Sequence, residues 1–285
     1  MNVKTWVQQC IKASLFLSGR LRRPVQSGCT FLIYHSVSGR LPIELDLAPA
    51  LLERQLAYLA QRGRVIAYEE ALQRLQRGIN VAGNIVLTFD DGYLDFYTTV
   101  YPLLQRWQLP ATLFVTTGFV EERVAYPMVS YPHLAVEPVT WAMLAEMAAS
   151  GLVTLGAHTH THPDLTTVSA TQVEEELAKP VALFQQRLGL TPKHFCYPRA
   201  CWRAELEGKI AGYYESAVVG GGTAATIATF QPYRIPRLPI RRSDGWRYFQ
   251  AKVEGRMGNE EAFYEGWRHP LRQAIRHSNK SPKQL

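Results

Sequence analysis

Two adjacent carboxylates, Asp90 and Asp91, stand where an apolar run gives way to a glycine. The preceding residues 84–89 are typical of a buried strand, and Gly92 permits a sharp turn directly after it. Within a strand the two side chains would point to opposite faces, whereas at its end both can reach one cavity. Two ionised carboxylates this close are unfavourable unless a cation lies between them or one holds a proton. The pair therefore indicates a cation-binding or proton-transfer site, with an ordinary Asp-Asp-Gly turn as the alternative.

Three imidazoles, those of His158, His160 and His162, lie within five residues after another apolar run. Positions i and i+4 fall on one side of the chain in extended or helical geometry, so His158 and His162 can bind one ion together and His160 is the weaker member. A carboxylate with two imidazoles and open water positions suits Zn²⁺ or another divalent transition metal such as Co²⁺ or Ni²⁺. The sequence therefore predicts one divalent metal ion as cofactor.

Apolar, strand-like runs alternate with helical patterns along most of the chain. This alternation is typical of βαβ units and of a mostly parallel sheet buried on both faces. About seven such units can close into an irregular (β/α) barrel, in which side chains just past the strand ends gather at one mouth. The expected strands cover residues 29–34, 65–67, 84–89, 111–115, 153–157, 195–197, 216–219 and 238–240, and the expected helices cover 49–61, 69–77, 97–107, 141–149 and 171–188. The residues expected at the mouth are His35, Asp90, Asp91, His158 and Tyr197.

Two segments resemble the first two signature motifs of the polysaccharide deacetylase family, the NodB-homology domain or carbohydrate esterase family 4. They are Thr-Phe-Asp-Asp-Gly at 88–92 and His-Thr-His-Thr-His-Pro at 158–163. Weaker similarities to the exopolysaccharide and biofilm branch of this family occur at residues 32–37, 112–115 and 233–237. The resemblance covers residues 30–238 and implies a NodB-like barrel with a carbohydrate N-deacetylase activity. It also implies that the metal ligands are Asp91, His158 and His162 and that the general base is Asp90.

The third motif of the family departs from its usual form in this chain. Its usual arginine falls on Cys196 and its closing glycine on Ala200, which leaves open what tethers the general base. Arg199 or Arg237 is expected to replace that arginine. By the resemblance, a backbone N–H near Tyr197 is expected to hold the oxyanion.

The general acid needs a separate assignment. The family's late leucine-rich motif normally ends in a histidine, and the comparable residues 238–242 contain none. In the exopolysaccharide branch the acid comes from a Tyr-His pair near the N-terminus, which implies His35, and a histidine can protonate a leaving amine near neutral pH. We expect this acid to face the metal from the opposite side to Asp90. His160 is the competitor, and a purely structural histidine at a strand end is the alternative for His35.

The overall composition is that of a globular protein with ample material for a large core. The 285 residues are 47% hydrophobic and 19% charged, and the net charge is +7 with Lys and Arg spread along the chain, so no nucleic-acid partner is indicated. Four cysteines are too few for a disulfide scaffold. A reduced state is the simpler expectation, with one Cys196–Cys201 bridge as the alternative.

We expect a catalytic domain at residues 28–256, an amphipathic basic extension at 1–27 and a helical, basic tail at 257–285. No convincing cleavage site follows the short apolar run near the N-terminus, so a cytoplasmic location is expected. The apolar face at 3–21, followed by Arg20, Arg22 and Arg23, suits a helix on the anionic inner face of a membrane. A helix packed on the body of the protein is an equal alternative.

The sequence predicts a metal-dependent hydrolase that removes an N-acyl group, N-acetyl first, from an amino sugar. The sugar is expected in a polysaccharide or in its lipid-linked precursor. Two alternatives stand beside this reading. One is a catalytically impaired carbohydrate-binding or scaffold protein with the same fold, which the altered third motif favours. The other is a different metal-dependent amidase or deformylase.

Overall fold

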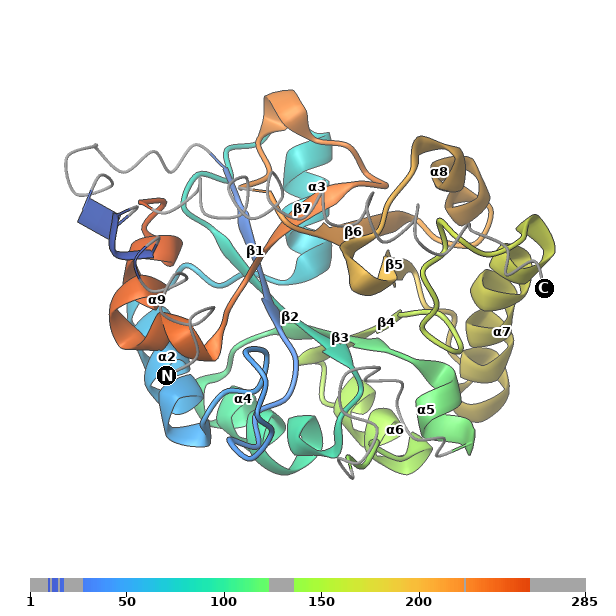
Figure 1. Ribbon diagram of the computed structural model, residues 1–285, viewed down its shortest axis with the longest axis horizontal. Helices are drawn as coiled ribbons and strands as arrows, with labels where there is room; N and C mark the ends of the chain where they lie inside the picture. The colour runs from blue at the N-terminus through green and yellow to red at the C-terminus, as the bar shows by residue number, and fades with distance from the viewer. Residues whose placement is uncertain are drawn as a thin grey trace, which may run out of the picture.

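The computed structural model describes residues 10, 12–14, 16–17, 28–122, 136–222 and 224–256. Seven parallel strands form a closed barrel in sequence order, and helices surround it (Figure 1). The irregular (β/α) barrel expected from the sequence is thereby confirmed. The strands are β1 (Thr30–Tyr34), β2 (Ile85–Asp91), β3 (Ala111–Val115), β4 (Val153–Ala157), β5 (His194–Cys196), β6 (Ser216–Gly220) and β7 (Ile235–Pro239).

The helices connect successive strands and pack on the outside of the barrel (Figure 1). They are α2 (Pro49–Arg62), α3 (Tyr68–Gln76), α4 (Tyr101–Trp107), α5 (Thr117–Glu122), α6 (Trp141–Ala149), α7 (Ala170–Leu188), α8 (Ala204–Ala211) and α9 (Gly245–Val253). Shorter turns are the π-helical η1 (Phe96–Val100) and the 3₁₀ turns η2 (Pro198–Ala200), η3 (Ile227–Thr229) and η4 (Arg242–Asp244). Among the described residues, no helix is long and apolar enough to span a bilayer.

The strands read as continuous apolar runs because both faces of the barrel wall are buried. Every residue of β2 and of β3 is buried. One outward cluster packs strand residues such as Leu87 and Phe89 against α2, α4, α6 and α9, whereas alternate residues such as Val86 pack in a separate cluster with Phe114. Gly156 in β4 is required by this packing, since a Cβ atom there would lie 2.5 Å from the Phe114 ring.

Closure of the barrel joins its first and last strands. In the β1–β7 ladder, Phe31 is paired with Arg237 and Ile33 with Pro239. On the other side of β1, Tyr34 is paired with Phe89 of β2. The carboxyl ends of β1, β2 and β7 therefore lie next to one another, although they are distant in the chain.

The expected strand at residues 65–67 is wrong as a barrel strand. Val65 forms only an isolated bridge with Ile85. The β2–β3 ladder begins with the pair Leu87 and Ala111, two residues after Ile85. Ile85 therefore has an edge free of β3, and Val65 forms its bridge at that position. The helices α5, α8 and α9 were not among those expected from the sequence.

The described helical residues near the N-terminus pack on the body of the protein. The Lys12 ammonium is buried and lies 2.5 Å from Asp244 Oδ1 and 2.6 Å from Ser243 Oγ. The Phe16 ring contacts that of Tyr248 edge to face. These contacts favour the packed alternative for this segment. Arg20, Arg22, Arg23 and the expected tail at 257–285 lie outside the described residues.

Candidate metal centre and catalytic site

The two motif carboxylates are the last two residues of β2, and the chain turns at the second of them. Asp91 itself has a left-handed φ of 82°, and Gly92 follows with 88°. This turn sends the two carboxylates to different partners, Asp91 toward the histidines after β4 and Asp90 toward β7. Both side chains are buried. The adjacent aspartates therefore occupy two neighbouring but distinct positions.

Asp91, His158 and His162 bring three donor atoms within 4.8 Å of one another. Asp91 Oδ1 lies 3.4 Å from His158 Nε2 and 3.8 Å from His162 Nε2. The Nδ1 atom of His158 is 2.8 Å from the carbonyl oxygen of Cys196, which fixes that ring with Nε2 toward Asp91. A metal-binding imidazole commonly has its second nitrogen held in this way. The three residues thus fit a divalent ion, as expected from the sequence.

The protonation of these groups matches a cation site. Burial lowers the pKa of His162 to about 3, so this imidazole is neutral at ordinary pH. Although burial opposes it, His158 has a pKa well above its usual range because Cys196, Asp91 and Asp90 favour the imidazolium. Burial raises the pKa of Asp91, but the hydrogen bond from His158 and the nearby imidazoles of His35, His162 and His158 together lower it. A metal ion would therefore displace one proton from the cluster when it binds.

Asp90 is held by Arg237, one of the two arginines that the sequence offered as a replacement for the usual motif arginine. Arg237, in β7, is buried and donates from Nη1 to Asp90 Oδ1 at 2.7 Å and from Nη2 to Oδ2 at 2.8 Å. Nη1 also donates to Thr88 Oγ1, whose hydroxyl donates to the Leu32 carbonyl. This guanidinium overcomes the effect of burial and lowers the pKa of Asp90, so the carboxylate is ionised. Arg237 thus supplies the tether that the altered third motif lacks.

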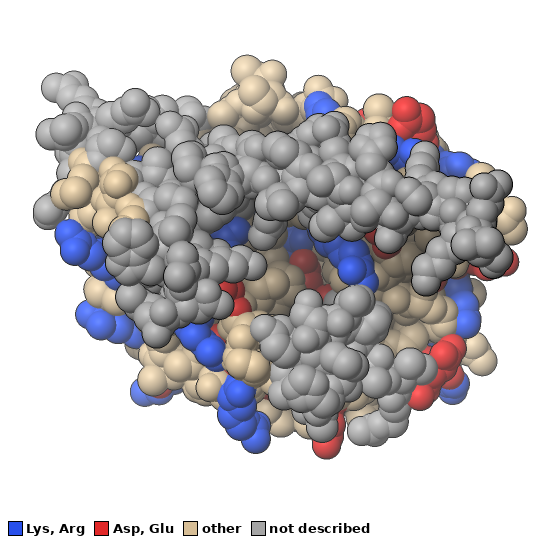
Figure 2. Space-filling view, viewed as in Figure 1, with Lys and Arg blue, Asp and Glu red and all other residues tan. Residues whose placement is uncertain are grey.

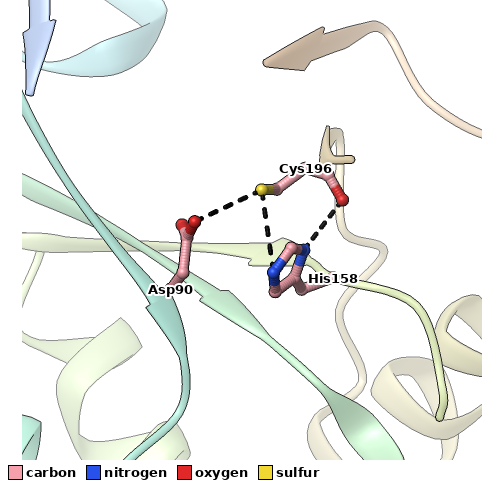
Figure 3. Close-up of side chains that lie close together, drawn as sticks. All are labelled: Asp90, His158 and Cys196. Atoms are coloured by element: carbon pink, nitrogen blue, oxygen red, sulfur yellow. Dashed lines mark hydrogen bonds between the residues drawn. The ribbon is translucent and has the colours of Figure 1, made fainter. Parts of the chain in front are cut away.

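Cys196 lies at the position of the family's usual arginine and faces the same carboxylate. Figure 3 shows Asp90, His158 and Cys196 pointing toward one another, with Cys196 Sγ 3.5 Å from Asp90 Oδ2 and 3.9 Å from His158 Nε2. These three could also hold an ion by distance. However, Arg237 Nη2 lies 2.8 Å from the same sulfur atom, so a fixed positive charge already occupies that side. We therefore assign the ion to the Asp91 group.

The remaining candidates lie in different surroundings. His35 Nε2 is 3.9 Å from Asp90 Oδ2, and the His35 side chain is 19% exposed. The two groups are neighbours, and the expectation that His35 faces the metal from the side opposite Asp90 stays a prediction. His160 points to Thr117 Oγ1 and Glu122 Oε1 instead of to the other histidines.

The sequence suggested an oxyanion donor near Tyr197 and Arg199 as one candidate to hold Asp90, but both residues have other partners in the structure. The Tyr197 N–H donates to the Val218 carbonyl within the barrel, and its hydroxyl donates to the Tyr233 carbonyl, so this residue offers neither group to an oxyanion. Arg199 has a left-handed φ of 58°, is exposed, and directs Nε to the His162 carbonyl at 3.5 Å. It therefore lies beside the metal-binding loop. The four described cysteines are free thiols, so Cys196 and Cys201 are not bridged.

Comparisons with known proteins agree with this site. Residues 79–214, which include both motifs, match the family model described as polysaccharide deacetylase. The chain is 30% identical over 140 residues to poly-beta-1,6-N-acetyl-D-glucosamine N-deacetylase of Escherichia coli K12. That match covers 47% of this chain but only 21% of the E. coli protein, so the chain corresponds to about a fifth of that relative.

The fold is shared with solved deacetylase structures. The deacetylase PplD of Streptococcus pyogenes, solved in complex with acetate, has a TM-score of 0.68 at 22% identity and covers 79% of this chain and 98% of its own. IcaB of Ammonifex degensii has a TM-score of 0.67 at 22% identity and covers 81% and 97%. At these identities the likeness concerns the barrel. The segment at residues 79–214, which carries both motifs, is therefore similar to the polysaccharide deacetylase family.

Proposed function

We propose that this protein is a metal-dependent N-deacetylase that hydrolyses the acetamido group of amino sugars in a polysaccharide. The observation that carries the proposal is the pairing of two neighbouring sites. One is the Asp91–His158–His162 donor set, and the other is an ionised carboxylate, Asp90, which Arg237 keeps beside it. Zn²⁺ suits this mixture of imidazole and carboxylate ligands, and Co²⁺ or Ni²⁺ would be accepted by the same set.

The reaction adds water to the amide carbon and breaks the bond between that carbon and the sugar nitrogen, giving acetate and a free amine. An ion bound by the three ligands supplies polarisation of the carbonyl and acidification of water. Asp90 accepts the proton that water loses, because it is ionised and does not belong to the ligand set. The nitrogen must gain a proton as it leaves, since an amide anion is a poor leaving group, and His35 is the nearest candidate donor.

His35 and Asp90 lie close enough to act as a pair. The 3.9 Å between His35 Nε2 and Asp90 Oδ2 lets a proton taken up by Asp90 be balanced by one given by His35. The Nδ1 atom of His35 is buried and makes no hydrogen bond with the described residues, so the ring is not fixed in one tautomer by a protein partner. This freedom suits a group that must gain and lose a proton in each cycle.

The substrate is proposed to be an N-acetylated glycan. The E. coli relative is named for poly-β-1,6-N-acetylglucosamine, and this polymer is the first substrate to test. Figure 2 shows a face that is hollowed at its centre, with both acidic and basic side chains at the hollow. The Arg237 tether also disfavours the impaired-scaffold alternative, because the base remains held although the usual motif arginine is missing.

The decisive experiment measures acetate release from β-1,6-linked N-acetylglucosamine oligomers, with peptidoglycan fragments and a small N-acyl amine in parallel. Acetate and free amine should appear in equal amounts, stop after chelation and return when Zn²⁺ is added. A His158→Ala, His162→Ala double variant is the control and should bind no ion. Undiminished acetate release by chelated protein, or hydrolysis of the small amide alone, would reject the proposal.

A further inference from the structure

The loop that carries the metal-binding histidines has an unfavourable backbone conformation. Thr159 and His162 have left-handed φ values of 63° and 59°. A non-glycine residue there is uncommon, and for a β-branched threonine it is an energetically unfavourable outlier. Between these two residues the chain makes the turn that brings His162 back beside His158. The surrounding structure must therefore hold the loop in this shape.

One side of the loop is held by α5. The Thr117 N–H donates to the Thr159 carbonyl at 3.2 Å, and the Gly118 N–H donates to the His160 carbonyl at 2.8 Å. The approach is so close that a Cβ atom on Gly118 would lie 2.6 Å from that carbonyl oxygen. These contacts fix the carbonyl groups of the loop, but they leave its N–H groups to be satisfied from elsewhere.

The His162 N–H donates to Thr159 Oγ1, whereas the N–H groups of His160 and Thr161 are satisfied by one carboxylate on α7, that of Glu176. Its Oε2 atom accepts from the His160 N–H at 2.7 Å and from the Thr161 N–H at 2.8 Å, and the Thr161 hydroxyl donates to Oε1. Glu176 is only 5% exposed. Among the described residues, no salt bridge joins it to a cation. In the described part of the chain, these loop donors are the polar groups that stabilise its carboxylate.

Burial of the Glu176 carboxylate is energetically unfavourable unless the loop adopts the observed turn. A buried carboxylate needs hydrogen-bond donors, and charge-assisted bonds to N–H groups are roughly twice as strong as neutral ones. The three donors converge on Glu176 only when residues 160 and 161 direct their N–H groups to the same side. Burial of Glu176 therefore favours the loop conformation that the left-handed residues oppose.

We propose that Glu176 is a positioning residue that sets the affinity of the metal centre by holding residues 159–162 in the turn that presents His158 and His162 to one ion. This proposal rests on the proposed metal-dependent function. Groups behind metal ligands commonly change metal affinity by about 10–100-fold when they are removed. Glu176 acts here through the backbone of the loop instead of through a ligand side chain.

The test compares Zn²⁺ dissociation constants, measured by chelator competition, for wild type, Glu176→Leu, Glu176→Gln and Glu176→Asp. Glu176→Leu should weaken Zn²⁺ binding by about 10–100-fold. Glu176→Gln should remain close to wild type, because its amide oxygen can accept both N–H groups while the Thr161 hydroxyl reverses to accept from the amide. Glu176→Asp, with its carboxylate drawn back by one methylene, should fall between them. The exposed neighbour Glu175, changed to Leu, is the matched control and should bind Zn²⁺ as wild type does.

The melting temperature of each metal-free variant separates positioning from general stability. If Glu176→Leu melts lower yet binds Zn²⁺ as tightly as wild type, the residue is only structural and the proposal is wrong. If Glu176→Gln binds Zn²⁺ as weakly as Glu176→Leu does, the explanation by hydrogen bonds to the loop is wrong. If Glu176→Leu fails to fold, an unchanged affinity in Glu176→Asp would reject the proposal equally. Failure of wild type itself to bind Zn²⁺ would instead reject the proposed function.

Discussion

Asp90 and Asp91 are adjacent in the chain but have different partners, so their substitutions should have different effects. Asp90→Asn should keep the metal ion and lose about 10²–10⁴-fold in acetate release, because proton transfer is removed while the ligand set stays intact. Asp91→Asn should lose the ion. Metal content and turnover of both variants check the assignment. Loss of the ion from Asp90→Asn alone would mean that the two roles are reversed.

Removing the charge of Asp90 should also reduce stability. The substitution leaves the buried guanidinium of Arg237 without its carboxylate, and breaking a buried pair from one side costs about 3–5 kcal/mol. The melting temperature of Asp90→Asn should therefore fall even though its metal content does not. Activity should be compared at a temperature at which both proteins are folded.

His35 and His160 can be distinguished by their surroundings. His35→Ala should keep the fold and the ion, and it should flatten the limb of the pH–rate profile on which activity is lost as the general acid loses its proton. His160→Ala removes the contacts to Thr117 and Glu122 and should leave the shape of that profile unchanged. An unchanged profile in His35→Ala, or the flattened one in His160→Ala, would exclude His35 as the acid.

At the scale of the elements, the arginine that holds Asp90 is Arg237 of β7, whereas the usual form of the third motif would place it in β5 at the position of Cys196. Cys196→Arg alone would place a second guanidinium within reach of Arg237 and should destabilise the fold and reduce turnover. The double variant Cys196→Arg, Arg237→Leu moves the cation back to β5 and should recover activity above that of Arg237→Leu. Acetate release and thermal melting of the three variants provide the check. No recovery in the double variant would show that β7 is the only strand from which an arginine can hold Asp90 here.

Asp95, which lies directly before η1 and contacts the loop after β1, has a carboxyl group that should respond to pH. The Ser36 hydroxyl lies 2.6 Å from Asp95 Oδ2 and 2.9 Å from Asp46 Oδ1, yet it has one proton to give. Asp46 already accepts the N–H groups of Ser38, Gly39 and Leu41. Burial raises the pKa of Asp95 to about 6. Below that pH, Asp95 is therefore the carboxyl of this pair that is protonated.

Because the folded pKa of Asp95 lies above its ordinary value, its contribution to stability is present at low pH and is lost as the pH rises through about 6. The free energy of unfolding of wild type relative to Asp95→Asn should therefore fall by about 1.4 kcal/mol between pH 5 and pH 8. Urea unfolding of both proteins at several pH values measures this. A difference that does not vary with pH would contradict the assignment of the proton to Asp95.

The sequence predicts those elements whose signals are local. The strands β1 to β4 and the helix α6 lie where they were expected. The strands could be located because burial on both faces requires an uninterrupted run of apolar residues. The sequence offered Arg199 and Arg237 as holders of Asp90 but could not choose between them, since Arg237 is 147 positions away and only barrel closure brings it to Asp90. Glu176 did leave a signal, an acidic residue within the buried stripe Val173, Leu177 and Pro180 of α7.

For the whole molecule, membrane contact by the N-terminal segment stays a prediction from the sequence, beside the packing of its described residues on the body of the protein. Lys12 is fixed against Asp244, so its charge is not available to a bilayer. Arg20, Arg22 and Arg23 are the candidates, and each arginine near an anionic surface contributes about 1 kcal/mol. Changing all three to glutamine in the full chain should weaken co-sedimentation with phosphatidylserine vesicles by about 10²-fold. Equal binding by the variant and wild type would reject membrane contact through these residues.

The tether from β7 to β2 has a consequence for how the protein acquires its activity. During synthesis β7 is the last strand of the barrel to leave the ribosome, and the 147 residues between Asp90 and Arg237 take about 7–30 s to translate. Throughout that interval the base has no guanidinium to orient it, whatever secondary structure the earlier strands have formed. The catalytic carboxylate is therefore set in place only when the first and last strands meet. A nascent chain that lacks β7 cannot hydrolyse its substrate by this mechanism.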